Sequence, residues 1–309
     1  MKKLNPNSLD IPWRAQDPCP CFSGKKYSEC CLQPDGLPLV DLPSLLPATN
    51  RTGHRNPGCY MQTTANCSEK LSREHYISKN ILDQFNQLAA SGLPWHLDDQ
   101  MVKYGANALA SKVLCSRHNT ALSPLDSAAG HAFRQITDAM NYVTKKSLAR
   151  QPKFFLVSGD ALELWGIKTL LGLYSAKVAR SKGKVLAADY EVDVVTALKA
   201  LSGGGVLKPL GLYIHPSTGE AIRHGIGVAP LTANDEKVLS GLRMNMTGIT
   251  LDFILDQRGG NPRFFEEGQF YRPWILDLNG PERCARIIFT WAARTQKATR
   301  VSLDISKSQ

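Results

Sequence analysis

Two groups of residues in the first 120 positions carry side chains that could do chemistry. One is Ser72-Arg73-Glu74-His75, an acid followed by an imidazole, and the other is Cys115-Ser116-Arg117-His118-Asn119. An imidazole suits general-base work because its ordinary pKa lies near neutrality. The oxygens of Glu74 and Asn119 suit a hard cation such as Mg²⁺ or Mn²⁺. These residue types predict metal-assisted hydrolysis, with His75 as the general base.

Cysteine is concentrated in the same part of the chain, because only Cys284 of the eight cysteines lies beyond residue 115. In a reducing compartment such clustering favours metal over disulfides. The first four thiols have spacings that can close a tetrahedral Zn²⁺ shell; they are Cys19, Cys21, Cys30 and Cys31. With all four positions taken by protein, zinc there would be structural. Cys284 stands alone beside an apolar stretch, and we expect it to be a buried core thiol.

A second zinc shell is predicted from Cys59, Cys67, Cys115 and His118. Cys115-x-x-His118 has the usual spacing of a zinc knuckle, whereas Cys59 and Cys67 are further apart than is usual. Zinc at this place would hold the ends of a hairpin together and keep the Glu74-His75 pair in register. Other histidines have no such context: His96 and His131 are expected to be structural, and His54 is unassigned.

Residues 17–31 resemble the SEC-C motif, the zinc tail at the C-terminus of the SecA translocation ATPase, which also occurs on many bacterial proteins. The resemblance implies zinc binding and a docking surface for a protein partner. One departure is Phe22, where the family usually has glycine. A structural knuckle without a partner is the alternative, and a chaperone like SecB is a weaker candidate partner.

Residues 58–148 resemble the HNH (ββα-metal) endonucleases. The stretch around Glu74-His75 is similar to the end of the family's first strand, and Cys115 to Asn119 is similar to its second knuckle. The resemblance implies that His75 is the general base, that Asn119 lies close to the metal, and that Glu74 assists the metal. His118 replaces the usual cysteine, so it either binds zinc or joins the active site. Asn107 is the nearest candidate for the family's middle asparagine.

Charge gives separate support for a nucleic-acid partner, with DNA the expected one. The chain has a formal net charge of +10, and residues 131–184 contain ten Lys/Arg against three acids. Such a surplus attracts phosphate backbones, although it is also typical of a solvated helix face. No apolar run is long enough to span a bilayer, and no apolar stretch follows the N-terminal lysines. We therefore expect a cytoplasmic protein with no membrane partner.

The elements that must position these residues give an α+β fold. We expect a zinc knuckle at 1–35, a proline-rich linker at 36–57, an HNH nuclease-like module at 58–150 and an α+β domain of unknown role at 151–309. Helices are predicted from Ser123, where Ser123-Pro124-Leu125-Asp126 forms a capping box, and at about 160–181, 189–201 and 233–242. Strands are predicted at 210–214, 226–228, 249–255 and 286–291.

The expected function is metal-dependent hydrolysis of phosphodiester bonds by an HNH-type endonuclease. The alternative is a non-catalytic zinc-binding adaptor that docks a protein partner through the SEC-C segment and binds nucleic acid. A third and weaker hypothesis makes residues 150–309 a sensor that controls the nuclease.

Overall fold

The computed structural model describes most of the chain, and all structural statements below refer to that part. The described residues are 9–42, 44–85, 87–91, 93, 96, 100–145, 151–178, 180–181, 184–185, 190–215, 225–232, 237–256, 269–293 and 299–305. Helices and strands are both abundant, which confirms the predicted α+β class.

Two larger sheets make up most of the strand content. The first is antiparallel, and its strand order is β12 (Phe270–Tyr271), β8 (Gly211–Ile214), β11 (Ile249–Ile254), β10 (Leu239–Met246), β9 (Ile226–Thr232). The second is mixed, in the order β15 (Arg300–Asp304), β13 (Ile275–Asn279), β14 (Cys284–Thr290), β5 (Lys153–Ser158). In the second sheet β13 and β14 are antiparallel, while β15 and β5 are each parallel to their neighbour.

In the described part of the chain, three smaller two-stranded pairs and four α-helices accompany these sheets. The pairs are β1 (Leu71–His75) with β4 (Ala110–Cys115), β2 (Ala89–Ala90) with β3 (Val102–Lys103), and β6 (Arg180–Ser181) with β7 (Lys184–Val185). The helices are α1 (Lys79–Leu82), α2 (Ser116–Thr144), α3 (Gly159–Ser175) and α5 (Val194–Lys199). Short 3-10 turns occur at Tyr27–Glu29, Gln62–Thr64 and Ala106–Ala108.

Helix α2 begins seven residues before its predicted start at Ser123, so the capping-box prediction was wrong. Cys115 is the residue before the first turn, and Pro124 lies inside the helix. A proline has no N–H to donate to the carbonyl four residues earlier. Here the Ser123 hydroxyl donates to that carbonyl, on Thr120, at 2.8 Å, which replaces the missing bond. The helix therefore continues through the proline.

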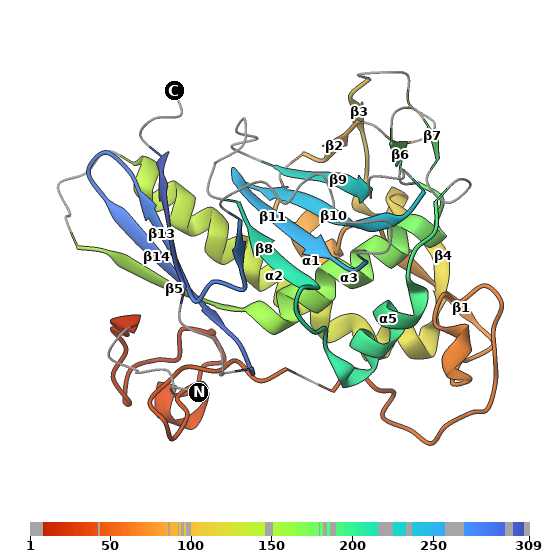
Figure 1. Ribbon diagram of the computed structural model, residues 1–309, viewed down its shortest axis with the longest axis horizontal. Helices are drawn as coiled ribbons and strands as arrows, with labels where there is room; N and C mark the ends of the chain where they lie inside the picture. The colour runs from red at the N-terminus through yellow and green to blue at the C-terminus, as the bar shows by residue number, and fades with distance from the viewer. Residues whose placement is uncertain are drawn as a thin grey trace.

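Helix α3 is buried on every side, which explains its almost continuous apolar sequence. It packs against α2 and against strands of both larger sheets, as Figure 1 shows for β10 and β11 above it. Gly166 allows close contact with β11, since a Cβ there would meet the Phe253 ring at 2.2 Å. The helix starts where the sequence predicted, but it ends at Ser175 rather than near 181.

The second half confirms the predicted strands and corrects two predicted helices. Strands β8, β9, β11 and β14 cover the four predicted stretches. The helix predicted at 189–201 is α-helical only at Val194–Lys199, and a π-helical turn follows to Gly204. Part of the helix predicted at 233–242 is strand β10, and residues 233–236 lie outside the described residues. Cys284 is only half-buried at the start of β14, so the prediction of a buried core thiol was wrong.

The four-stranded sheet is covered on both faces. Alternate residues of β5 divide between two hydrophobic clusters: Phe155 and Val157 join the main core, whereas Leu156 packs with Cys19, Tyr27 and Cys31. Helix α2 packs on the first of these faces. The N-terminal segment lies on the other, below β5 and β14 in Figure 1.

Candidate metal centres and candidate active site

The four N-terminal thiols converge as predicted. Cys21 Sγ lies 3.3 Å from Cys19 Sγ and 3.4 Å from Cys30 Sγ, and Cys31 Sγ lies 3.8 Å from Cys30 Sγ. All four sulfurs lie within 4.8 Å of one another. Zinc bound to four sulfurs at about 2.3 Å needs neighbouring sulfurs roughly 3.8 Å apart. The donor set and its spacing therefore fit a structural Zn²⁺ ion.

Local backbone conformation brings these thiols together. Gly24 has a φ of +76° between the two cysteine pairs, and the 3-10 turn at Tyr27–Glu29 leads directly into Cys30. The Cys19 amide donates to the Lys25 carbonyl at 2.8 Å, which closes the loop. Burial raises the pKa of the Cys19 thiol to about 11. A bound cation is what would favour the thiolate there.

The second shell also forms, and it includes His118. Its Nδ1 atom lies 3.2 Å from Cys115 Sγ, 3.6 Å from Cys59 Sγ and 3.7 Å from Cys67 Sγ. All four side chains are buried. Roughly 3.6 Å is the separation that a tetrahedral zinc bound to nitrogen and sulfur requires. The wide spacing of Cys59 and Cys67 is therefore compatible with zinc, and His118 lies among the thiols.

A partner outside the shell orients His118. Its other ring nitrogen, Nε2, lies 3.1 Å from the Thr64 hydroxyl, and that hydroxyl donates to the Met61 carbonyl at 2.8 Å. With metal on Nδ1, Nε2 carries the proton and donates to Thr64, so the network is consistent. Metal-binding histidines usually have such a second hydrogen bond, which fixes the ring.

The second shell lies where strands and helix meet. Strand β1 pairs with β4 in antiparallel register from Leu71↔Cys115 to His75↔Ala110, and α2 follows β4 directly. Cys115 ends β4, His118 is in the first turn of α2, and Cys67 precedes β1. Zinc there would join both strands and the helix at one point.

His75 lies at the opposite end of β1 from the zinc shell. Burial is the largest influence on its pKa and lowers it, Lys79 and Arg73 lower it further, and a hydrogen bond with Asn107 opposes them. Nε2 of His75 is shielded from solvent and has no hydrogen-bond partner within the described part of the chain. Burial thus favours the neutral form of the His75 imidazole, and its Nε2 atom lacks a partner among the described residues. Asn107, the candidate middle asparagine, contacts the predicted base itself.

Glu74 is part of a buried ion cluster that the sequence did not predict. Lys168 of α3 places its Nζ 2.5 Å from Glu74 Oε1 and 2.7 Å from Asp126 Oδ2. The side chain of Lys168 is 2% exposed and that of Glu74 is 9% exposed. Ser78 donates to Asp126, and the Trp165 indole donates to Ser78 at 2.6 Å.

The Lys168 ammonium stays charged in this cluster. Burial opposes the charge, but the Glu74 and Asp126 carboxylates outweigh it, and the pKa of Lys168 is raised. Burial also raises the pKa of Glu74 against the opposing effect of Lys168, but the short Lys168–Glu74 contact is that of an ion pair. Asp126 lies inside α2 and binds Lys168 and Ser78, so it is not the acidic member of a capping box. Lys168 is also not part of a basic surface, which removes one of the ten basic residues counted between 131 and 184.

The predicted catalytic residues each have a different partner. Asn119, in the first turn of α2, donates to the Ser72 hydroxyl at 2.8 Å. Glu74 binds Lys168, and His75 binds Asn107. The donors around Glu74 do not fit a divalent cation, because the Lys168 ammonium already neutralises the carboxylates that would hold one. Glu74 is therefore not placed to bind Mg²⁺ or Mn²⁺ in this arrangement.

Three further histidines, His131, His96 and His54, do not belong to this site. His131 lies on α2, its ring 5.5 Å from that of Phe22, and burial lowers its pKa. His96 is buried and bonded to Tyr104, which agrees with a structural role. His54 is exposed. None of the described helices has both the length and the apolar character needed to cross a membrane.

Comparison with known proteins supports the first metal centre. The family model of the SEC-C motif matches residues 17–33, which contain all four N-terminal cysteines. Neither the curated proteins nor the solved structures gave a match to this chain. The resemblance of residues 58–148 to HNH endonucleases gained no support from these comparisons and stays a hypothesis. The fold and sites thus define an α+β protein with a SEC-C zinc motif and a second Cys₃His cluster compatible with zinc.

Proposed function

We propose that this chain cleaves phosphodiester bonds of nucleic acid, with His75 as the general base. The observation that carries the proposal is the unpartnered Nε2 atom of a neutral His75, at the end of a hairpin that zinc would fix. A general base needs a free ring nitrogen and a pKa near or below the working pH. Asn107 fixes the other side of the ring, so the free nitrogen has a defined direction.

The chemistry follows from these residues. Nε2 accepts a proton from water, the water oxygen attacks phosphorus, and the bond to the leaving sugar oxygen breaks. The leaving oxygen takes its proton from solvent on the opposite side of phosphorus, and the imidazolium releases its proton to water. Arg73 and Lys79 lie close enough to His75 to affect its pKa, and both have exposed side chains that can bind a phosphate. DNA is the preferred candidate substrate, given the net charge of +10.

One feature of the site limits the reaction. Nε2 of His75 is shielded from solvent, so the chain around it must open for water and phosphate to enter. Binding energy from the nucleic acid backbone is a source for such an opening. In this mechanism the nucleic acid binds first, and the His75 base becomes accessible only afterwards.

A second candidate function is an adaptor that binds nucleic acid and a protein partner without cutting. Two observations favour it, namely the closed Glu74–Lys168 pair and the shielded His75. In this case a protein partner would bind the SEC-C segment at the face around Phe22, which is 73% exposed. The opposite face, around Tyr27, already packs on the four-stranded sheet.

The test compares three zinc-loaded proteins on supercoiled plasmid and on single-stranded DNA and RNA: the wild type, His75→Ala and His54→Ala. His54→Ala is the matched control because His54 is an exposed histidine outside the site. Reactions contain Mg²⁺, Mn²⁺ or no added metal, and fluorescence anisotropy measures binding in parallel. Cleavage by the wild type and His54→Ala but not by His75→Ala supports the nuclease. Binding by all three without cleavage of any substrate supports the adaptor.

A further inference from the structure

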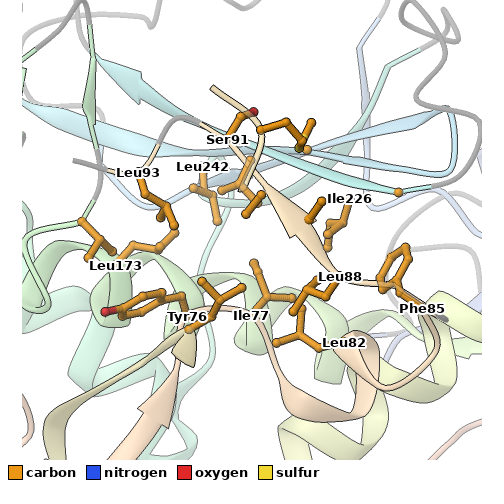
Figure 2. Close-up of a pocket in the computed structure, with 18 of the residues that line it drawn as sticks. Tyr76, Ile77, Leu82, Phe85, Leu88, Ser91, Leu93, Leu173, Ile226 and Leu242 are labelled. Atoms are coloured by element: carbon orange, nitrogen blue, oxygen red, sulfur yellow. The ribbon is translucent and has the colours of Figure 1, made fainter. Parts of the chain in front are cut away.

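A cavity of about 720 Å³ lies beside the candidate active site, between the segment that follows β1 and the five-stranded sheet. Tyr76, Ile77 and Leu82 line one side of it, and Ile226 and Leu242 line the other. Helix α3 contributes a further wall through Leu173. Figure 2 shows these side chains arranged around one common space.

The lining is apolar, and among the described residues that line the cavity none is charged. The polar side chains in this described lining are those of Gln87, Ser91 and Tyr76, and the Tyr76 hydroxyl already has a partner in Ser111 at 2.7 Å. An ionised ligand would lose its hydration there without a compensating charge, which is costly. The described lining therefore disfavours nucleotides and other charged ligands.

The cavity opens to solvent at an apolar rim. Met101 and Val228 belong to its lining and are 66% and 37% exposed. They are two of the few large apolar side chains that are exposed among the described residues. Exposed apolar side chains at the entrance of an apolar cavity are typical of a ligand-binding site.

We propose that this cavity binds an uncharged, mostly apolar small molecule. Its volume lies within the range of roughly 300–1,000 Å³ that is usual for small-molecule sites. The walls come from segments far apart in the sequence, which include the chain after β1, β2 with the residues beside it, α3, β9 and β10. A ligand there would contact Tyr76 and Ile77, the two residues after His75. It is therefore placed to change the position of His75; this coupling rests on the proposed function, whereas the binding does not.

The test uses two dyes with the same aromatic skeleton and the full zinc-loaded chain. N-phenyl-1-naphthylamine is neutral, and 1-anilinonaphthalene-8-sulfonate adds one negative charge. We expect the neutral dye to bind at one site per chain, with a rise and blue shift in fluorescence, and at least tenfold more tightly than the sulfonate. Absence of saturable binding of the neutral dye, or equal affinity for both dyes, would overturn the proposal.

Variants locate the site. Ala90→Trp places an indole in the lining, and Ala229→Trp is its control, because Ala229 is exposed on β9 and outside the lining. Ile226→Asn is a second lining variant that changes polarity with little change in size. We expect a loss of at least tenfold in dye affinity for Ala90→Trp and Ile226→Asn, and affinity like the wild type for Ala229→Trp, with circular dichroism confirming the fold. Unchanged affinity in both lining variants would place the dye elsewhere.

The proton NMR signals of His75 measure the coupling without any cleavage. Addition of the neutral dye should shift them in the wild type and in Ala229→Trp. Dye binding without such a shift would leave a binding site that does not act on His75. Failure to cleave nucleic acid would not affect either result, so the two proposals can fail independently.

Discussion

Replacing Lys168 by methionine tests the buried ion cluster most directly. The Nζ atom lies 2.5 Å from Glu74 and 2.7 Å from Asp126, and the Lys168 side chain is 2% exposed. Methionine keeps most of the volume but removes the positive charge, so Glu74 becomes a buried carboxylate without a counter-ion. Breaking such a pair by removing one partner costs about 3–5 kcal/mol of unfolding free energy. We expect Lys168→Met to lose about that amount.

Lys79→Met is the matched control. Lys79 Nζ lies 2.6 Å from Asp83, almost the same distance, but both side chains are about half exposed. An exposed pair contributes roughly 0.2–1 kcal/mol, because water and salt screen it. The two ion pairs are therefore of similar length, but they differ in burial and in the number of acidic residues around the lysine.

Urea denaturation of the zinc-loaded proteins measures the difference. Glu74→Gln is added to the Lys168→Met background, where it removes the unpaired charge and should recover part of the loss. The desolvated ion pair would be refuted by two results together. Lys168→Met would lose no more unfolding free energy than Lys79→Met, and Glu74→Gln would recover none of that loss.

The remaining predictions concern zinc, protons and packing. Metal analysis should find two zinc ions per chain, and Cys30→Ser and Cys115→Ser should each bind one fewer; a single zinc in the wild type would leave only one shell. The pKa of His75 is lowered in the fold, so the neutral ring stabilises the folded protein above pH 6.5, and this contribution is lost as the pH falls through the folded pKa. An NMR titration should give a His75 midpoint below 6.5, and a midpoint above that value would contradict the proposed neutral base. Gly166→Ala should destabilise the fold by about 1–3 kcal/mol because the new methyl group overlaps a phenylalanine ring on β11, whereas Gly172→Ala on the same helix, with open space at its Cβ, should gain up to about 1 kcal/mol. Thermal melts of the two alanine variants should therefore shift in opposite directions.

Much of the site could be predicted because its signals are local. The four ligands between Cys19 and Cys31 could be recognised because they lie within a few residues of one another. Four thiols so close in the sequence can bind one metal ion in few other ways. The second shell was predictable for the same reason at Cys115-x-x-His118. The strands of the second half, such as β11, were recognisable from their continuous apolar residues.

The cluster around Glu74 could not be predicted, because its partner is distant in the sequence. Lys168 is 94 positions from Glu74, and in the sequence it resembles any basic residue on a helix. Glu74 of β1 and Lys168 of α3 come together because both elements pack against α2. The predicted start of α2 was wrong for a different reason. Pro124 is typical of the first turn of a helix, but here the Ser123 hydroxyl replaces the hydrogen bond that the proline cannot make, so the helix passes through it.

The position of the SEC-C segment has a consequence for biosynthesis. Its zinc ligands all lie between residues 19 and 31, so this shell can form as soon as that stretch leaves the ribosome. Its apolar face, however, packs on Leu156 and Ile288, and the Val40 amide bonds to Thr290. At about 5–20 residues per second, the ribosome needs roughly 13–50 s to make the chain between residue 40 and residue 290. During that interval the zinc-loaded segment presents an uncovered apolar surface, of the kind that chaperones of nascent chains bind.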